Sequence, residues 1–131
     1  MVLNDVCLHH LFHKTQQSFT AFVGGVLNEF NSNILINGSK YAIVEADEYD
    51  RSFLNLNPSI GLITSIDSDH LDIYGSFDEV KKSFKEFIKK ITNKVVVSRD
   101  TGINGITYSL NEKADYSANN ISFSKTGYFF D

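Results

Sequence analysis

The sequence predicts an α/β fold in which a mostly parallel sheet is flanked by helices, with a small antiparallel portion near the C-terminus. Two almost continuous apolar runs, Lys40 to Ala46 and Ile60 to Ile66, are typical of strands covered on both faces, as in parallel sheets. Apolar residues recur at helical spacing from Phe77 to Ile91, and a third buried-type strand follows from Lys94 to Ser98. Strand, helix and strand in this order form a parallel crossover unit, which favours an α/β architecture.

Shorter elements are predicted before this unit. Asp5 to Lys14 mixes apolar and polar residues as a short helix does. Phe19 to Val23 is β-branched and aromatic, and we expect a strand that stops in a tight turn at Gly24-Gly25. Asn31 to Asn37 predicts another short strand near an edge of the sheet.

The main helix and the C-terminal third carry their own signals. Ser76 followed three places later by Glu79 fits a capping box at the helix start. Three segments after the third buried strand predict short antiparallel strands: Gly105 to Leu110, Tyr116 to Ser124 and Tyr128 to Asp131. A turn at residues 125–127 joins the last two.

Composition excludes several classes of protein. The 131 residues suit one domain, and a net charge of −4 argues against general nucleic-acid binding. No apolar run reaches the roughly 20 residues that span a bilayer. A single cysteine, Cys7, cannot form an internal disulfide, so we expect a cytoplasmic protein with Cys7 as a small core residue. His9, His10 and His13 have no further ligand nearby and are interpreted as surface residues.

Acidic side chains gather where two predicted strands end. They are Glu45, Asp47, Glu48 and Asp50 after the first strand, and Asp67, Asp69 and Asp72, with His70 among them, after the second. In open α/β sheets, ligands bind beyond the carboxyl ends of the strands. Clustered carboxylates repel one another unless a cation compensates, and Mg²⁺ prefers such oxygen ligands. The sequence therefore indicates a magnesium site, with Asp69 and Asp72 as groups that would orient His70.

Plainer interpretations compete for some of these residues. Asp50 and Arg51 fit a solvated loop with a local ion pair, and Asp72 fits a turn cap. Glu45 differs because it continues directly from a buried run, where an unpaired carboxylate is costly.

Two motifs carry a resemblance to a known family. The motifs are E-A-D-E-x-D-x-S-F, which begins at Glu45, and D-H-x-D-x-Y, which begins at Asp69. They lie within four segments: TAFVGG (Thr20 to Gly25), VEADEYDRSFLNLNP (Val44 to Pro58), ITSIDSDHLDIYGSFDEVKKSFKEF (Ile63 to Phe87) and ADYSANNI (Ala114 to Ile121). In these segments the chain resembles the central ATP-binding domain of the Mur ligases, from about Thr20 onward.

The resemblance implies a reaction and a site. Mur ligases use ATP to phosphorylate a carboxylate, and an amino group then attacks the acyl phosphate, with Mg²⁺ screening the phosphate charge. The resemblance implies that Glu45 and His70 are the magnesium ligands and that Glu48 and Asp69 act through water or through hydrogen bonds to the ligands. The residues that it places toward the muramoyl substrate are Gly24, Gly25, Asn31, Ser32 and Asn33.

The segments are most similar to the branch of the family that adds L-alanine to UDP-N-acetylmuramate in peptidoglycan synthesis. Two alternatives stay open. One is a ligase that recycles murein tripeptide, which shares the E-A-D-E and D-H parts of these motifs. The other is a non-catalytic protein that kept the fold for binding or assembly.

The chain also departs from the family pattern. It contains no phosphate-binding loop G-x-x-G-K-T/S and no strand preceding such a loop, nor an N-terminal UDP-binding or C-terminal ligase domain. We therefore expect residues 1–131 to form a single partial domain, inactive alone, with an exposed sheet edge through which it self-associates. The place of the carbamylated lysine found in several Mur ligases falls near Phe84 and Lys85, without a defined match.

Overall fold

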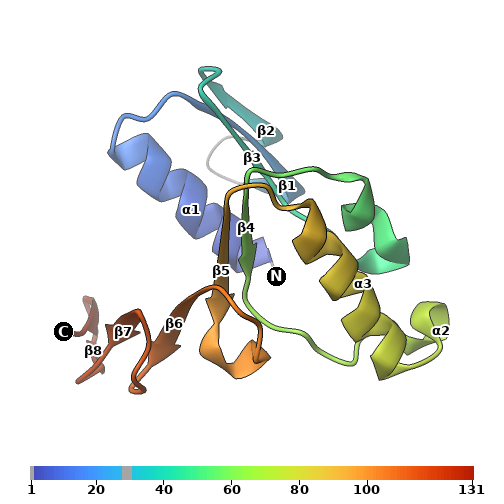
Figure 1. Cartoon of the computed structure of the whole chain (residues 1–131). Helices are drawn as coiled ribbons and strands as arrows, with labels where there is room; N and C mark the ends of the chain where they lie inside the picture. The colour runs from blue at the N-terminus through green and yellow to red at the C-terminus, as the bar shows by residue number, and fades with distance from the viewer. Residues whose placement is uncertain (1, 28–30) are drawn as a thin grey trace. The chain divides into compact units, whose positions relative to one another are not determined.

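The computed structural model describes the backbone of residues 2–27 and 31–131, and the side chains of residues 7–26 and 31–131. The chain divides into two compact units, residues 1–47 and residues 48–131. The first unit contains a helix and three strands: α1 (Val2–Lys14), β1 (Phe19–Leu27), β2 (Ser32–Asn37) and β3 (Tyr41–Val44). The central strand β1 pairs antiparallel with β2 and parallel with β3, so the strand order is β2-β1-β3 (Figure 1).

The core of the first unit lies between α1 and its sheet. Phe19, Ala21 and Ile43 are buried, and Leu8 and Phe12 of α1 pack against them. The rings of Phe12 and Phe19 meet edge to face with centroids 5.7 Å apart. This geometry is favourable for aromatic pairs, and it fixes α1 on one face of the sheet.

The predicted helix and edge strand of this unit are confirmed, but two predictions about α1 are wrong. Cys7 is exposed rather than part of the core, and His9 is buried rather than on the surface. Residues three or four apart share one helix face. His9 therefore faces inward with Phe12, whereas Cys7 faces solvent with the exposed Leu11.

The prediction that β1 stops in a turn at Gly24-Gly25 is also wrong. The strand continues through both glycines to Leu27, although its pairing with β2 changes register between Phe22 and Leu27. Glycine in a strand often marks such an irregularity or a close approach by another group. Here the close approach comes from Glu45, as described below.

The second unit is built on a four-stranded parallel sheet. In chain order, its elements are the 3-10 helix η1 (Tyr49–Asn55), β4 (Ile60–Ile63), α2 (Leu71–Tyr74), α3 (Phe77–Lys90), β5 (Lys94–Ser98), η2 (Arg99–Thr101), β6 (Ile106–Leu110), β7 (Tyr116–Ala118), β8 (Ser122–Ser124) and β9 (Gly127–Phe129). The strand order β4-β5-β6-β7 follows the chain, and β8 and β9 form a separate antiparallel pair (Figure 1). The predicted fold class is therefore confirmed.

The crossover unit β4–α3–β5 forms as predicted. Ser76 precedes α3, and its hydroxyl accepts a hydrogen bond from the Glu79 N–H at 3.4 Å. The apolar face of α3 packs on η1, where the ring of Phe53, 2% exposed, lies 5.2 Å from that of Phe84 and 5.0 Å from that of Phe87. This aromatic cluster anchors the segment that carries the second half of the acidic motif.

The antiparallel prediction holds for the β8–β9 hairpin but fails for β6 and β7. Both strands join the sheet in parallel. Parallel neighbours usually need a long crossover, whereas β6 and β7 are joined only by residues 111–115. Asn111 takes a left-handed conformation with φ 58°, and Asp115 bonds back to Thr107, so this short arc returns the chain beside β6, and β7 then runs in the same direction.

No helix in the described part of the chain is long and apolar enough to cross a membrane.

Candidate functional site

Glu45 lies at the carboxyl end of β3, where its backbone and side chain both bond to β1. Its N–H donates to the Phe22 carbonyl at 3.1 Å, which extends the parallel pairing one residue past Val44. Its carboxylate oxygen Oε2 accepts the N–H of Gly24 at 2.5 Å. Because the acceptor is charged, this is a strong kind of hydrogen bond, and it fixes the direction of the half-buried side chain.

Gly24 leaves the space that this carboxylate occupies. A Cβ atom at position 24 would lie 2.8 Å from Glu45 Oε2 and 3.3 Å from Cδ. Any larger residue would therefore displace the carboxylate. Gly24 and Glu45, which the sequence placed in separate motifs, form one structural feature.

The other residues expected toward the substrate lie near the same end of this sheet. Gly25 continues β1, and the register pairs Leu27 with Ser32 at the start of β2. The hydroxyl of Ser32 is engaged within its own strand, donating to the Ile34 carbonyl and accepting from the Ile34 N–H. Asn31 has a left-handed backbone with φ 47°, and Asn33 is exposed.

In the second unit, the residues after Asp47 meet those of the D-H-x-D-x-Y motif. The Tyr49 ring stands edge-on to the His70 imidazole, with centroids 5.2 Å apart at 89°. The hydroxyl of the buried Tyr74 donates to the Glu48 carbonyl at 2.5 Å. Two segments that β4 separates in the sequence are thereby joined.

Unusual backbone geometry accompanies this contact. Asp50 (φ 48°), Arg51 (φ 57°) and His70 (φ 58°) all adopt the left-handed conformation. The turn carries the Arg51 guanidinium over the Tyr74 ring, 4.6 Å from its centroid, which is cation–π geometry. Sequence reasoning gave Tyr74 no role, although its place in the motif was a signal.

Glu48 carries an unpartnered acceptor. Its Oε2 atom is buried and has no hydrogen-bond partner among the described residues. A buried acceptor of this kind is costly unless a cation or donor reaches it. Asp67, Asp69, His70 and Asp72 are exposed. The described residues contain no group of three acidic, histidine or cysteine side chains that could hold a metal ion.

This donor set fits a hard cation that needs few protein ligands. Carboxylate oxygens suit Mg²⁺, which keeps several waters and commonly takes one or two protein groups plus phosphate oxygens. Glu45 belongs to the first unit and His70 to the second, so each half of the candidate site is described within its own unit. Lys85 of α3 is exposed, and Phe84 packs on Phe53.

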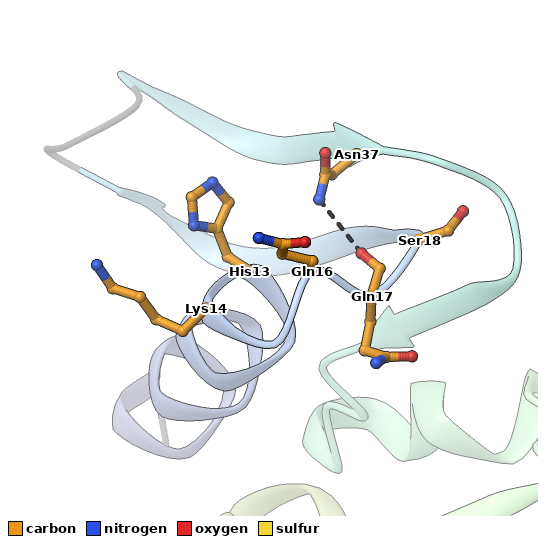
Figure 2. Close-up of a pocket in the computed structure, with 6 residues that line it drawn as sticks. All are labelled: His13, Lys14, Gln16, Gln17, Ser18 and Asn37. Atoms are coloured by element: carbon orange, nitrogen blue, oxygen red, sulfur yellow. Dashed lines mark hydrogen bonds between the residues drawn. The ribbon is translucent and has the colours of Figure 1, made fainter.

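A hollow of about 510 Å³ lies elsewhere in the first unit. Figure 2 shows its lining residues: His13, Lys14, Gln16, Gln17, Ser18 and Asn37. The Asn37 amide donates to the Gln17 carbonyl at 3.2 Å, and the Ser18 hydroxyl accepts the Ser39 N–H at 3.1 Å. The hollow adjoins the start of β1, at the opposite end of the sheet from Glu45, so it is not part of the candidate site.

Comparisons with known proteins agree with this architecture. Residues 8–131 match the family model of the Mur ligase middle domain. A UDP-N-acetylmuramate–L-alanine ligase of Christiangramia forsetii is 44% identical over 95% of this chain, and one of Flavobacterium johnsoniae is 42% identical over 95%. The chain spans 28% of the length of each relative.

A solved structure shares the fold. The UDP-N-acetylmuramate-alanine ligase of Thermotoga maritima superposes with a TM-score of 0.75 and 23% sequence identity, covering 89% of this chain and 28% of that one. Together with the match over residues 8–131, these similarities establish that the chain belongs to the Mur ligase family, as a middle domain.

Proposed function

We propose that this chain supplies part of the ATP- and magnesium-binding site of a ligase that joins L-alanine to UDP-N-acetylmuramate in the cytoplasm. Relatives with that enzyme name are 44% and 42% identical to it, and the chain corresponds to 28% of their length. The observation that carries the proposal is the Glu45 carboxylate, held by the Gly24 N–H at the carboxyl end of β3. Ligands of open α/β sheets bind at that edge.

The proposed reaction has two steps. A carboxylate oxygen of the muramoyl group attacks the γ-phosphorus of ATP, and ADP leaves. The amino group of L-alanine then attacks the acyl carbon, phosphate leaves, and an amide bond results. When bound, Mg²⁺ would neutralise the charge that gathers on the phosphate oxygens.

Each of the candidate site residues has a proposed part in this reaction. Glu45 and His70 hold the cation, and Glu48 and Asp69 act on it through water. The unpartnered Glu48 Oε2 supports this assignment, because a hydrated cation would give it a donor. Gly25 and the residues Asn31, Ser32 and Asn33 face the muramoyl substrate.

Residues 1–131 contain no G-x-x-G-K-T/S motif, so the groups that hold the ATP phosphates are proposed to lie outside them. The chain would then be a partial domain, inactive alone. The outer edge of β3 pairs with no strand in the described residues, and we propose self-association through such an edge. Sedimentation velocity tests this last point, since a monomer at all concentrations would disprove it.

The full-length protein provides the test of the reaction. We expect release of phosphate from ATP only when both UDP-N-acetylmuramate and L-alanine are present, and loss of turnover in Glu45→Ala with the fold intact by circular dichroism. Turnover with murein tripeptide in place of L-alanine would identify a recycling ligase instead. Tight ATP binding by residues 1–131 alone, without turnover in the full-length protein, would favour a binding protein.

A further inference from the structure

We propose that Gly24 is a positioning residue, whose N–H and missing side chain together present one oxygen of Glu45 to a divalent cation. The inference rests on the proposed function, because it assumes that Glu45 binds the cation. It goes further by assigning a specific task to a glycine that would otherwise only border the substrate.

The first step of the argument concerns the two oxygens of the carboxylate. Oε2 accepts the Gly24 N–H, while Oε1 has no hydrogen bond to the residues that the structure describes. With one oxygen committed to the backbone, the carboxylate cannot rotate freely. Groups that bond to a ligand in this way orient it and tune its affinity for the metal.

The second step concerns the backbone of β1. The Glu45 N–H bonds to the Phe22 carbonyl as a regular parallel ladder requires. Two residues further along β1, the N–H of Gly24 bonds to the Glu45 side chain instead of a backbone carbonyl. The parallel pairing of β1 with β3 ends at Phe22 and Val44. The Gly24 N–H therefore lies past the paired part of these two strands, where the carboxylate accepts it.

The third step concerns space. A Cβ on residue 24 would meet Glu45 Oε2 at 2.8 Å, and the three nearest atoms all belong to the Glu45 carboxyl group. Since the obstacle is the end of a flexible side chain, Gly24→Ala is expected to push the carboxylate aside and keep the strand. The substitution should therefore damage cation binding far more than folding.

A first experiment tests the hydrogen bond without any metal. In ¹⁵N–¹H spectra of the 131-residue chain, the Gly24 amide proton is expected downfield, as for a short bond to a carboxylate. Glu45→Ala should move it upfield and leave the amides of β5 in place. A Gly24 amide that does not respond to Glu45→Ala would overturn the proposal.

A second experiment tests the effect on the cation. Mn²⁺ takes the same oxygen ligands as Mg²⁺ and broadens nearby amide signals. In the full-length protein with ATP, Mn²⁺ should broaden residues around Glu45, and Gly24→Ala should raise the concentration needed by about 10- to 100-fold. Gly61→Ala is the matched control, because its Cβ would meet the side chain of Ile91 instead. It should lower the melting temperature and leave the Mn²⁺ response unchanged.

The outcomes separate this inference from the proposed function. Broadening around Glu45 that is equally sensitive to Mn²⁺ in Gly24→Ala would overturn the positioning role and leave Glu45 as a ligand. No broadening around Glu45 in the wild-type full-length protein with ATP would overturn the cation site, and the positioning role with it. If Gly24→Ala does not fold, the double variant Gly24→Ala/Glu45→Asp makes room for the new Cβ, and it should fold yet still bind Mn²⁺ weakly. Wild-type Mn²⁺ sensitivity in that variant would disprove the positioning role.

Discussion

The Tyr74 hydroxyl donates a hydrogen bond to the backbone carbonyl of Glu48 across 2.5 Å, and so ties the end of the D-H-x-D-x-Y motif to the middle of the E-A-D-E-x-D-x-S-F motif. Tyr74 is buried, so neither partner of this bond has free access to water in its place. The bond holds the segment that carries Glu48 and Tyr49 beside the segment that carries His70.

Removing this hydroxyl should cost stability. We expect Tyr74→Phe to lower the free energy of unfolding by about 1 kcal/mol, because the Glu48 carbonyl loses its donor while the ring still packs. Urea unfolding followed by circular dichroism measures the change. Tyr116→Phe is the control, since Tyr116 is 69% exposed and should be neutral. Equal stability of Tyr74→Phe and wild type would show that the bond contributes nothing.

The left-handed backbone at Asp50 predicts a stabilising substitution. Asp50 has φ 48° and ψ 28°, a conformation that glycine adopts without steric cost. We expect Asp50→Gly to raise the free energy of unfolding by about 0.5–1 kcal/mol. Asp78→Gly, in the first turn of α3, should instead lower it by about 1 kcal/mol. A loss of stability in Asp50→Gly would mean that its side chain matters more than the strain.

Much of the fold could be predicted because its strongest signals are local. The apolar stripe of α3, its Ser76 cap and the buried run of β5 are each encoded within a few residues. The parallel arrangement of β6 and β7 could not be predicted in this way. It depends on an arc closed by Asp115 and Thr107, whereas the short connection alone indicates an antiparallel pair.

The candidate site also has one feature that could be predicted from the sequence and others that could not. Glu45 could be singled out because it follows an apolar run that predicts a buried strand, where a carboxylate needs compensation, although only Ile43 of β3 is buried. Its contact with Gly24 could not, because it depends on the pairing of β1 with β3, two strands that are distant in sequence. The position of Arg51 over Tyr74 could not be predicted either, because it depends on a contact between two segments that are distant in sequence.

The buried Glu48 oxygen predicts a substitution that stabilises the protein in the absence of metal. In EDTA, Glu48→Gln should raise the free energy of unfolding by about 1 kcal/mol, because a neutral amide is less costly to bury than an unpartnered carboxylate. Thermal unfolding measures this. Glu86→Gln, on the exposed face of α3, should change it by less than about 0.5 kcal/mol. Destabilisation by Glu48→Gln in EDTA would indicate that the carboxylate already has a stabilising partner.

Asp115 predicts a specific dependence on pH. The backbone N–H of Thr107 donates to its Oδ2 at 2.8 Å and the Thr107 hydroxyl at 2.7 Å, and these bonds hold the pKa of Asp115 below its usual value. A carboxyl whose pKa is lowered in the folded state adds stability above its unfolded pKa and loses it as the pH falls through the folded value. Thr107→Val removes the hydroxyl and keeps the N–H, so we expect the pKa of Asp115 to rise toward normal. A carboxyl ¹³C titration measures that shift directly, and Thr92→Val, at an exposed position outside the arc, should leave it unchanged. If Asp115 titrates at the same pH in Thr107→Val as in the wild type, the hydroxyl does not stabilise the carboxylate, and the bond from the Thr107 N–H alone lowers the pKa of Asp115.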